Sequence, residues 1–530
     1  MTTHDPRVDV VICGGGLAGL ACARQLKRSQ PHLSILVLER QAGAIEPGAH
    51  KVGEATVEGG GRYLTDHLGL TGYFNRHHLH KLGLRMFFGN AHRPLWERPE
   101  LGVRQFPRVP SYQVDRGVCE RDLRQVIVDD GITLVEGAHI TDVELAQGAA
   151  VPHVVSYEDA SGQAREARGR FLVDATGRRR LLHRKLNLGR PSPHQANAAW
   201  FRLRGEYEVE AMGEGAPPVW KPPTQERRWF STNHMMGKGY WIWMIPLVSK
   251  NTSIGIVADP RVHPAAQYST KERAFCWLQQ HEPTLHRFIR DAETLDFRLM
   301  QKFAYLTSQV FSPQRWSCVG EAALFLDPFY SPGLDFIAYT NWMTCKAVEL
   351  DQQGKLTATA TDRFNRFLLD DLVPNFLPLY QDNYQVFHST AVMTSKVIWD
   401  TCFYWALPCP MLFGGHLVDL QALDDFHELA QQFRPIQQRT QDAFREWGTF
   451  AREPREYLFT DYSKLPMCAR LHLDLLARRS RVDCMREMRK NISAFAAWSR
   501  QIVASVEKSA ASARALATEA QGTVAEVGSP

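Results

Sequence analysis

Three glycines near the N-terminus have the spacing of a nucleotide-binding turn. Gly14, Gly16 and Gly19 follow the apolar run VDVVIC (8–13) and open a small-residue helix, LAGLACARQLKRS. Such glycines let the backbone approach a pyrophosphate at the positively polarised end of a helix. Glu39 ends the next apolar run, SILVLER, and its carboxylate can accept hydrogen bonds from ribose hydroxyls. The order strand, glycine turn, helix, strand and acidic residue predicts a dinucleotide site on a doubly wound sheet.

A second candidate is the run YWIWMIP (240–246), which has two tryptophans two residues apart. Alternate residues of a strand share a face, so Trp241, Trp243 and Ile245 are predicted to form one bulky apolar wall. TSIGIVAD (252–259) is predicted to be the neighbouring strand. Taken alone, the wall is ordinary core, since paired aromatic residues fill cores well.

The composition limits the function classes. The chain has 530 residues, is 44% hydrophobic and 22% charged, and carries a net charge of +5, so nucleic acid is not expected as its main partner. Its ten cysteines form no CxxC pair, which fits a reducing cytoplasm and predicts no metal site, His77, His78 and His80 included. The N-terminal run MTTHDPRV lacks the succession of basic segment, apolar stretch and cleavage site, so no leader is expected, and no apolar run reaches the ~20 residues that cross a bilayer.

Further motifs indicate which dinucleotide binds. Asp174 and Gly177 lie in VDATGR after a predicted strand, Glu321 follows another in GEA, and Arg116 lies in QVDRGVCERDL. These motifs resemble those of the FAD-binding superfamily that includes aromatic hydroxylases, although Asp is usual at the position of Glu321. The resemblance implies FAD contacts for all four residues. No second GxGxxG follows a strand, so the reducing electrons are expected from a separate NAD(P)H-dependent flavin reductase.

Within that superfamily, the run WxWxIP resembles the signature of the flavin-dependent halogenases. Gly53 to Thr56 matches the GEAT segment that lies near the flavin in this family, which implies contacts from Glu54, Ala55 and Thr56. Lys81, in LHKLGLRMFF (79–88), resembles the family's essential lysine, and Trp241 and Trp243 are implied to stand beside the flavin. The competing interpretations are a solvent-facing Lys81 and, less consistent with the family pattern, Lys51 in its role.

The resemblance implies a chemistry. FADH2 and O2 would form a flavin C4a-hydroperoxide, halide would attack it, and hypohalous acid would travel through a tunnel to Lys81. A desolvated ammonium can hydrogen-bond or capture the halogen and present it to an electron-rich ring. The tryptophan wall would exclude organic substrate and bulk water from the flavin.

The loop DPFYSPG (327–333) departs from the family pattern. The resemblance places Asp327 at the cofactor and the halide against Ser331, Gly333 and Leu334, but Pro332 has no N–H to offer an anion. Tryptophan halogenases have a catalytic glutamate where this chain has Tyr330. The expected substrate is therefore a small phenolic or similarly activated aromatic, free or held on a carrier protein, rather than free tryptophan.

The expected fold is α/β, a Rossmann-like FAD-binding domain with an inserted β-rich substrate region and a helical C-terminal region. The predicted division is 1–200 with 300–345 for FAD, 200–300 for the substrate and tunnel region, 346–507 for the helices, and a disordered tail over 508–530. Two alternatives to a halogenase of secondary metabolism stay open. One is a related flavin monooxygenase or dehydrogenase without halide chemistry, with Pro332 as its sign, and the other is a non-catalytic flavoprotein partner in a biosynthetic complex.

Overall fold

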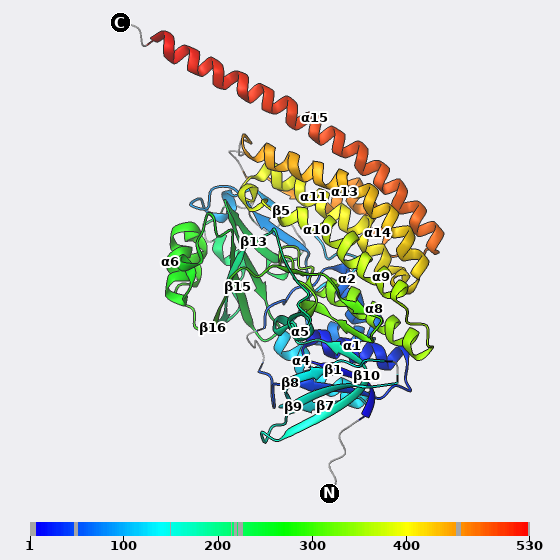
Figure 1. The fold of residues 1–530 in the computed structure, drawn as a ribbon. Coiled ribbons are helices and arrows are strands. Elements are labelled where there is room, and N and C mark those ends of the chain that lie inside the picture. The colour runs from blue at the N-terminus through cyan, green and yellow to red at the C-terminus, as the bar shows by residue number, and fades with distance from the viewer. Residues whose placement is uncertain are drawn as a thin grey trace.

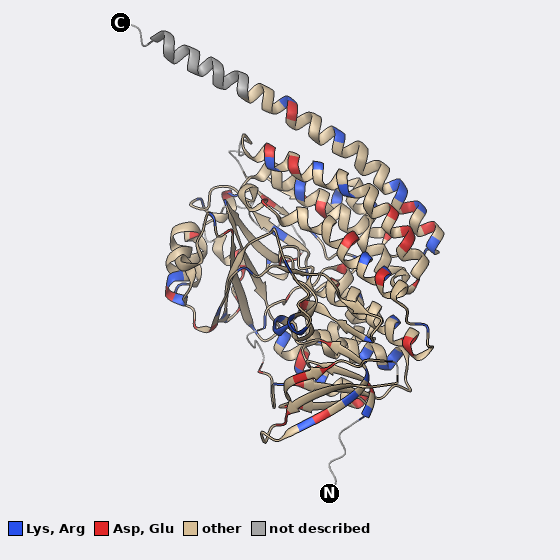
Figure 2. Ribbon diagram, in the orientation of Figure 1, with Lys and Arg blue, Asp and Glu red and all other residues tan. Residues whose placement is uncertain are grey.

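The computed structural model describes residues 7–46, 51–148, 150–213, 215–216, 220, 226–451 and 457–527, with side chains described up to residue 513. Two large sheets and a layer of helices make up the molecule, and a long C-terminal helix lies along that layer and projects beyond it (Figure 1). Within the described residues, no helix is long and apolar enough to cross a membrane. Lys and Arg are interspersed with Asp and Glu over the helical layer (Figure 2).

The first sheet has the predicted doubly wound core. Its strand order is β18-β19-β10-β1-β2-β7, parallel from β19 to β7, with β9 and β8 continuing from the far part of β10. Its strands are β1 (Arg7–Cys13), β2 (Ile35–Glu39), β7 (Thr133–Glu136), β8 (His139–Glu144), β9 (His153–Glu158), β10 (Ala164–Asp174), β18 (Phe311–Ser312) and β19 (Trp316–Cys318). Cys13 pairs with both Asp174 and Leu38, so three of the predicted nucleotide motifs meet where these strands end.

The second sheet has YWIWMIP near its centre. Its order is β16-β12-β15-β14-β13-β4-β5-β20. Its strands are β4 (Leu84–Phe87), β5 (Glu100–Gly102), β12 (Asn197–Arg204), β13 (Thr232–Gly237), β14 (Tyr240–Pro246), β15 (Asn251–Ala258), β16 (Thr294–Met300) and β20 (Phe459–Asp461). The predicted pairing of β14 with β15 is confirmed as antiparallel. Strands β4, β5 and β20, from outside residues 200–300, also join this sheet. The predicted domain boundaries stay a prediction. Two small two-stranded sheets pair β3 (Leu79–His80) with β6 (Tyr112–Gln113) and β11 (Gly189–Pro191) with β17 (Tyr305–Thr307).

The two faces of β14 enter different cores. Trp241, Trp243 and Ile245 pack in the main hydrophobic cluster, between the sheet and the cofactor-side elements. Ile242 and Met244 pack in a second cluster that includes residues of α6 (Lys271–His281). The predicted wall of two tryptophans and an isoleucine on one face is therefore confirmed, and it packs in the same cluster as the strands that carry the nucleotide motifs.

Helices cover the first sheet and form the C-terminal layer (Figure 1). Their bounds are α1 (Leu17–Ser29), α2 (Glu58–Arg62), α3 (Thr71–His77), α4 (Arg116–Asp129), α5 (Leu181–Lys185), α7 (Pro283–Ile289), α8 (Gly333–Gln352), α9 (Ala358–Arg366), α10 (Val373–Tyr380), α11 (Thr390–Ala406), α12 (Pro408–Phe413), α13 (Leu420–Gly448), α14 (Pro466–Asp474) and α15 (Arg481–Val527). Helix α15 continues through most of the segment for which a tail was predicted, and a disordered tail over 508–530 stays a prediction that partly lies outside the described residues.

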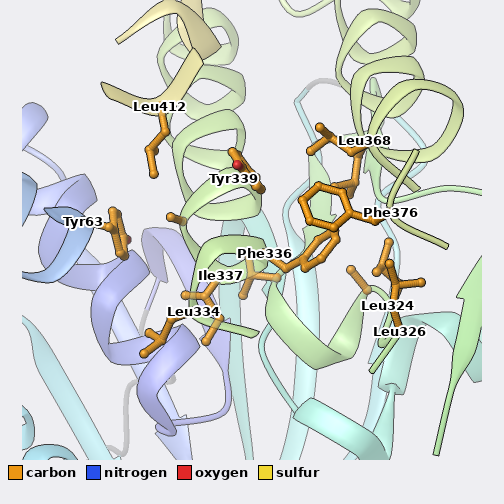
Figure 3. Packing of buried hydrophobic residues seen from close by; sticks show 14 of the residues in the cluster. Tyr63, Leu324, Leu326, Leu334, Phe336, Ile337, Tyr339, Leu368, Phe376 and Leu412 are labelled. Carbon is orange, nitrogen blue, oxygen red and sulfur yellow. The ribbon is translucent and has the colours of Figure 1, made fainter. Parts of the chain in front are cut away.

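Helix α8 begins at the candidate site, and side chains of its first turns pack in two directions. Leu334 and Ile337 point from its first turns toward the side of Tyr63, whereas Phe336 points toward Phe376 of α10 (Figure 3). The Phe336 and Phe376 rings are 5.7 Å apart between centroids and tilted by 63°, an edge-to-face geometry that aromatic pairs favour. These opposed contacts hold the start of α8 in one orientation.

Candidate active site

The glycine turn forms one wall of a long groove at the carboxyl ends of β1, β2 and β10. Gly14 and Gly16 line this groove together with Glu39. Gly14 has φ +115°, and a Cβ there would lie 2.3 Å from the Ala175 carbonyl oxygen, so a side chain cannot be accommodated. A Cβ on Gly19 would lie 2.0 Å from the Gly14 carbonyl oxygen. These close approaches are what the nucleotide-binding fingerprint requires.

Glu39 and Asp174 have different roles in the groove. The Glu39 carboxylate accepts hydrogen bonds from the Gly15 N–H at 2.6 Å and the Gln41 N–H at 2.8 Å, and it keeps acceptor capacity for ribose hydroxyls. Asp174 is buried and accepts from the Thr176 N–H and hydroxyl, at 2.9 and 2.6 Å. We therefore assign Asp174 the shaping of the turn that presents Gly177 to the groove rather than a direct contact.

The sequence did not single out Arg178 and Arg179, which also line the groove. Two guanidinium groups there suit the phosphates of a dinucleotide. Lys51, the competitor of Lys81, is ion-paired with Glu120 at the same groove, so the structure places it on the nucleotide side.

Arg116 and Glu321 lie where the groove meets a second cavity, since both residues line both spaces. Arg116 is held by an ion pair with Glu120 at 2.5 Å and donates to the Val52 carbonyl oxygen at 2.8 Å. Burial raises the pKa of Glu321, partly offset by Arg178 and Arg116. The two connected spaces fit a dinucleotide with a ring system at one end, and Glu321 stands where the chain joining them would pass.

We call this second cavity the ring cavity. Hydrogen bonds join its tryptophan wall to the GEAT segment. The Trp243 indole N–H donates to Ser253 Oγ at 3.1 Å, and that hydroxyl donates to Glu54 at 2.9 Å. Glu54 is buried and ion-paired with Arg202 at 2.7 Å. Burial raises the pKa of Glu54 and the Arg202 guanidinium opposes that rise. The WxWxIP and GEAT motifs, which are far apart in sequence, therefore form one rigid corner of the ring cavity. Trp243, Glu54 and Ala55 line this corner.

Trp241 is linked in the same way to the loop that follows β19. Its indole N–H donates to Tyr384 Oη at 3.0 Å, and Tyr384 donates to Asp327 Oδ2 at 2.6 Å. His194 Nε2 lies 2.5 Å from the same oxygen, and the other oxygen accepts from the Phe329 N–H. Asp327 is thus buried beneath the loop, away from the walls of both spaces, and we assign it the anchoring of the loop in place of the expected cofactor contact.

The loop from residue 330 to residue 335 separates the ring cavity from a third space that contains Lys81. Ser331, Gly333 and Leu334 face the ring cavity, whereas Tyr330, Pro332 and Asp335 face the Lys81 cavity. This alternation depends on a left-handed backbone at two non-glycine residues, with φ 71° at Tyr330 and φ 58° at Ser331. Such strain persists only where the surrounding structure enforces it, and it is often found at functional sites.

The predicted halide donors differ in whether their N–H groups are free to bind an anion. The Ser331 N–H donates to the Pro328 carbonyl oxygen at 2.9 Å and is not available to an anion. Gly333 and Leu334 begin α8, where backbone N–H groups lack partners in the preceding turn, and both line the ring cavity. Pro332 precedes them as the N-terminal cap and lines the Lys81 cavity rather than the ring cavity.

The GEAT segment also passes from one cavity to the other. Glu54 and Ala55 line the ring cavity, and Val57 and Glu58 line the Lys81 cavity. Thr56 lies between them, and its carbonyl oxygen accepts a hydrogen bond from Lys81 Nζ at 2.8 Å. Lys81 therefore stands at the boundary of the two spaces.

Lys81 is 1% exposed, so the interpretation of a solvent-facing lysine is wrong. Burial lowers the pKa of Lys81 to about 7, and the nearby Glu58 and Asp335 oppose that fall. Both the ammonium and the neutral amine are therefore populated near neutral pH. The ammonium can donate a hydrogen bond to a halogen oxidant, and the neutral amine can capture the halogen.

Sequence reasoning singled out Tyr330 but missed several residues around it in the Lys81 cavity. Tyr330 donates to Asp400 Oδ2 at 2.8 Å, and the buried Lys396 donates to the same oxygen at 2.6 Å. The EGGG run after GEAT was the one available signal, because consecutive glycines at a helix start indicate close packing. Asp335, Phe376 and Tyr380 are among the lining residues that had no signal, and Tyr404 and Trp405 line the cavity as well.

Comparisons with known proteins agree with this geometry. The family model described as tryptophan halogenase matches residues 93–372, and that described as FAD dependent oxidoreductase matches residues 9–125. The chain is 25% identical to flavin-dependent halogenase chlA of Dictyostelium discoideum, covering 77% of this chain and 71% of the relative. It is 27% identical to the 1H-pyrrole-2-carbonyl-[peptidyl-carrier protein] brominase of Pseudoalteromonas luteoviolacea, covering 62% and 74%.

Among solved structures, halogenase PltM has the same fold, with a TM-score of 0.66 at 17% identity over 91% of this chain and 96% of that chain. The tryptophan halogenase match covers more than half of the sequence, and the cavities are arranged for FAD. The chain therefore belongs to the tryptophan halogenase family and is an FAD-dependent halogenase.

Proposed function

We propose that this enzyme uses FADH2, O2 and halide to form hypohalous acid, and that it halogenates a phenolic or similarly activated aromatic in secondary metabolism. The observation that carries the proposal is the position of Lys81. Two segments, residues 53–58 and 330–335, each cross from the ring cavity to the Lys81 cavity, and Lys81 bonds to one of them at the crossing point.

The ring cavity suits the formation of an oxidised halogen. Bound reduced flavin with O2 would supply the oxidising equivalents. The N–H groups of Gly333 and Leu334 would hold the halide at the positive end of α8. Trp241 and Trp243 are buried and anchored by hydrogen bonds, so they would form an apolar wall of this cavity that excludes bulk water from the flavin. The loop over 330–335, rather than the tryptophan wall, would keep the organic substrate away from the flavin.

The Lys81 cavity suits transfer of the halogen to a ring. Lys81 would hydrogen-bond hypohalous acid, or form a haloamine when neutral, and orient the halogen toward the substrate. Tyr330 fills the position of the tryptophan halogenases' glutamate and is bonded to Asp400, which favours an activated ring that needs little help in losing its proton.

The substrate's delivery and the electron source are also part of the proposal. One relative is named as acting on a pyrrole held by a peptidyl carrier protein, and halogenase PltM has also been solved in complex with phloroglucinol and FAD. We therefore expect the aromatic substrate to be either carrier-bound or free. A separate flavin reductase and a cytoplasmic location are expected for this chain.

Bromination assays test the proposal. The purified protein is supplied with FAD, a flavin reductase, NADH, O2 and bromide, and is offered activated phenols free and on a carrier protein. A brominated product by mass spectrometry that is lost in Lys81→Ala supports a halogenase. Hydroxylated or desaturated product without halogen would instead support a related monooxygenase or dehydrogenase, and flavin binding without turnover would support a non-catalytic partner.

A further inference from the structure

Three carboxyl groups line the Lys81 cavity, from Glu58, Asp335 and Asp400. Asp400 is fully engaged, because Oδ2 accepts from Lys396 and Tyr330, and Oδ1 accepts from the Gln441 amide at 2.7 Å. Both oxygens of Asp400 therefore already have donors, so neither is free to receive the proton of a substrate hydroxyl.

Asp335 is different because one of its oxygens is unused. Its Oδ1 accepts from the Gly60 N–H, and the Tyr404 hydroxyl makes a further hydrogen bond to the carboxyl group. Asp335 is 1% exposed, and Oδ2 has no hydrogen-bond partner among the described residues. Buried carboxylate oxygens are rarely left without a partner, since the lost hydration costs free energy. A donor supplied by a ligand in the cavity would complete the group.

The glycines of the EGGG run explain how Asp335 can be positioned there. A Cβ on Gly59 would lie 2.9 Å from both Asp335 Oδ1 and Tyr404 Oη, and a Cβ on Gly60 would lie 2.6 Å from Leu334 Cβ. The Gly59 N–H donates to Tyr404 Oη at 2.9 Å. Helix α2 therefore approaches α8 and α11 closely enough to hold the Asp335 carboxyl group by one oxygen and leave the other for a ligand.

We propose that Asp335 is a catalytic base that accepts the proton of a ring hydroxyl, and that the substrates of this enzyme are phenols that enter un-ionised and carry no carboxylate. The proposal rests on the proposed function and names its substrate class. Charge supports the second part, because Lys81 is the only Lys or Arg among the described residues of the cavity wall, which carries the carboxyl groups of Glu58 and Asp335 besides Asp400, the partner of Lys396. A substrate carboxylate would be placed beside like charges in a dry space.

The step balances as an aromatic substitution. The hydroxyl proton moves to Asp335 Oδ2 as the ring carbon attacks the halogen of the hypohalous acid held by Lys81. The carbon–halogen bond forms, the halogen–oxygen bond breaks, and the released hydroxide takes a proton from the Lys81 ammonium to leave as water. The ring carbon then gives its proton to the Lys81 amine, Asp335 returns the hydroxyl proton to the ring oxygen, and the net reaction is ArOH + HOX → XArOH + H2O.

The ionisation of the cavity is consistent with this role. Burial raises the pKa of Asp335 to about 7, so the group is poised between acid and base at neutral pH. Its titratable neighbours from the packed elements are Glu58 of α2, Lys81 before β4, Tyr339 of α8, Tyr380 of α10, Tyr404 of α11 and Cys409 of α12. Burial keeps the tyrosines and the thiol neutral, which leaves Glu58 and Lys81 as the charges that tune Asp335.

Asp335→Asn tests the proposal, with Asp371→Asn as the matched control. Asp371 is also buried, also has an unpartnered Oδ2, and has a pKa raised to about 6, mainly by burial, but it lies outside the cavity wall. We expect Asp335→Asn to brominate a phenol at least ~100-fold more slowly, the range for loss of a general base. Hypohalous acid captured by a small trapping reagent should stay within about two-fold of wild type, and Asp371→Asn should leave both rates unchanged.

A methyl ether of the same phenol provides a comparison that does not depend on the folding of a variant. Without a hydroxyl proton to give, the ether should react at least ~100-fold more slowly than the phenol in wild type, and Asp335→Asn should lower that rate no further. In wild type, the activity on the phenol should rise with pH as Asp335 ionises near pH 7, and this limb should vanish in the variant.

Several results would overturn the role of Asp335. They are an undiminished phenol rate in Asp335→Asn, an equal loss on phenol and ether, the same loss in Asp371→Asn, or loss of the pH limb in Glu58→Gln instead. Absorbance of a chromogenic phenol bound to the resting protein separates this failure from failure of the proposed function. The phenol is one whose pKa matches that of Asp335, so that it can give up its proton before any halogen is present. A phenolate band in wild type that is absent in Asp335→Asn supports the base even if no ring is halogenated, and a band of equal size in both refutes it.

Discussion

Replacing Lys81 by methionine should abolish halogenation and at the same time stabilise the protein. Lys81 is 1% exposed, and its pKa falls from 10.5 to about 7 on burial. Because the folded state holds this amine with a lowered pKa, folding at pH 8 requires most of the unfolded chains' Lys81 ammonium groups to lose a proton. The penalty is fully present below about pH 7 and disappears as the pH rises above about 10.5.

The size of the effect follows from that shift. At pH 8 the penalty is about 3 kcal/mol of the free energy of unfolding, since each pKa unit corresponds to about 1.4 kcal/mol. Methionine has a similar length, so it leaves little cavity, but the Thr56 carbonyl oxygen loses its donor, which costs about 1–2 kcal/mol. The net expectation is a gain of about 1–2 kcal/mol at pH 8 that is gone by pH 10, where the remaining penalty of about 1 kcal/mol no longer exceeds the cost of the lost hydrogen bond.

Denaturant unfolding of both proteins at pH 8 and pH 10 measures the gain, and bromination of a phenol with a trapping assay measures the chemistry. A variant that is less stable than wild type at pH 8 would show that Lys81 serves the fold, and one that still brominates the ring would show that it does not direct the halogen. Lys464→Met, a lysine at the surface side of a short turn outside the cavity wall, controls for charge removal and should change neither quantity.

Three further substitutions test the walls of the cavities. Ser253→Ala removes the hydroxyl that donates to Glu54, and we expect flavin to bind about five-fold more weakly in a fluorescence titration, because one buried hydrogen bond contributes about 1 kcal/mol; unchanged affinity would contradict the rigid corner. Gly60→Val places atoms against Leu334 Cβ, 2.6 Å from the nearest new carbon, so hypohalous acid formation should fall while flavin remains bound. Arg202→Met leaves two buried carboxyl groups without their cation and should lower the free energy of unfolding by about 3–5 kcal/mol, measured in urea, whereas a loss under 1 kcal/mol would argue against these ion pairs.

The nucleotide turn and the tryptophan wall could be predicted because their causes are local. Gly14 and Gly19 are required by backbone clashes within a short segment, and Glu39 follows at a fixed distance along the strand–helix–strand unit. The faces of YWIWMIP follow from the two-residue period of a strand, and the structure confirms them.

The function of those motifs depended on packing that no local pattern encodes. Which face of the tryptophan strand meets the first sheet depends on how the second sheet packs. The strands of that second sheet come from distant parts of the chain, from β4 to β20. Pro332 was expected to weaken the halide site, but the left-handed backbone at Tyr330 and Ser331 turns Pro332 into the Lys81 cavity and leaves Gly333 facing the ring cavity.

The sequence alone therefore determined the cofactor turn, the strand faces and, through the family resemblance, the importance of Lys81. Only the tertiary structure decided that Asp335 and Tyr404 join it, since the Gly59 N–H and the Tyr404 hydroxyl that meet there are 345 residues apart in the chain. The physical reason is that a side chain's chemistry depends on its burial and its partners, and these arise when α2, α8 and α11 pack together.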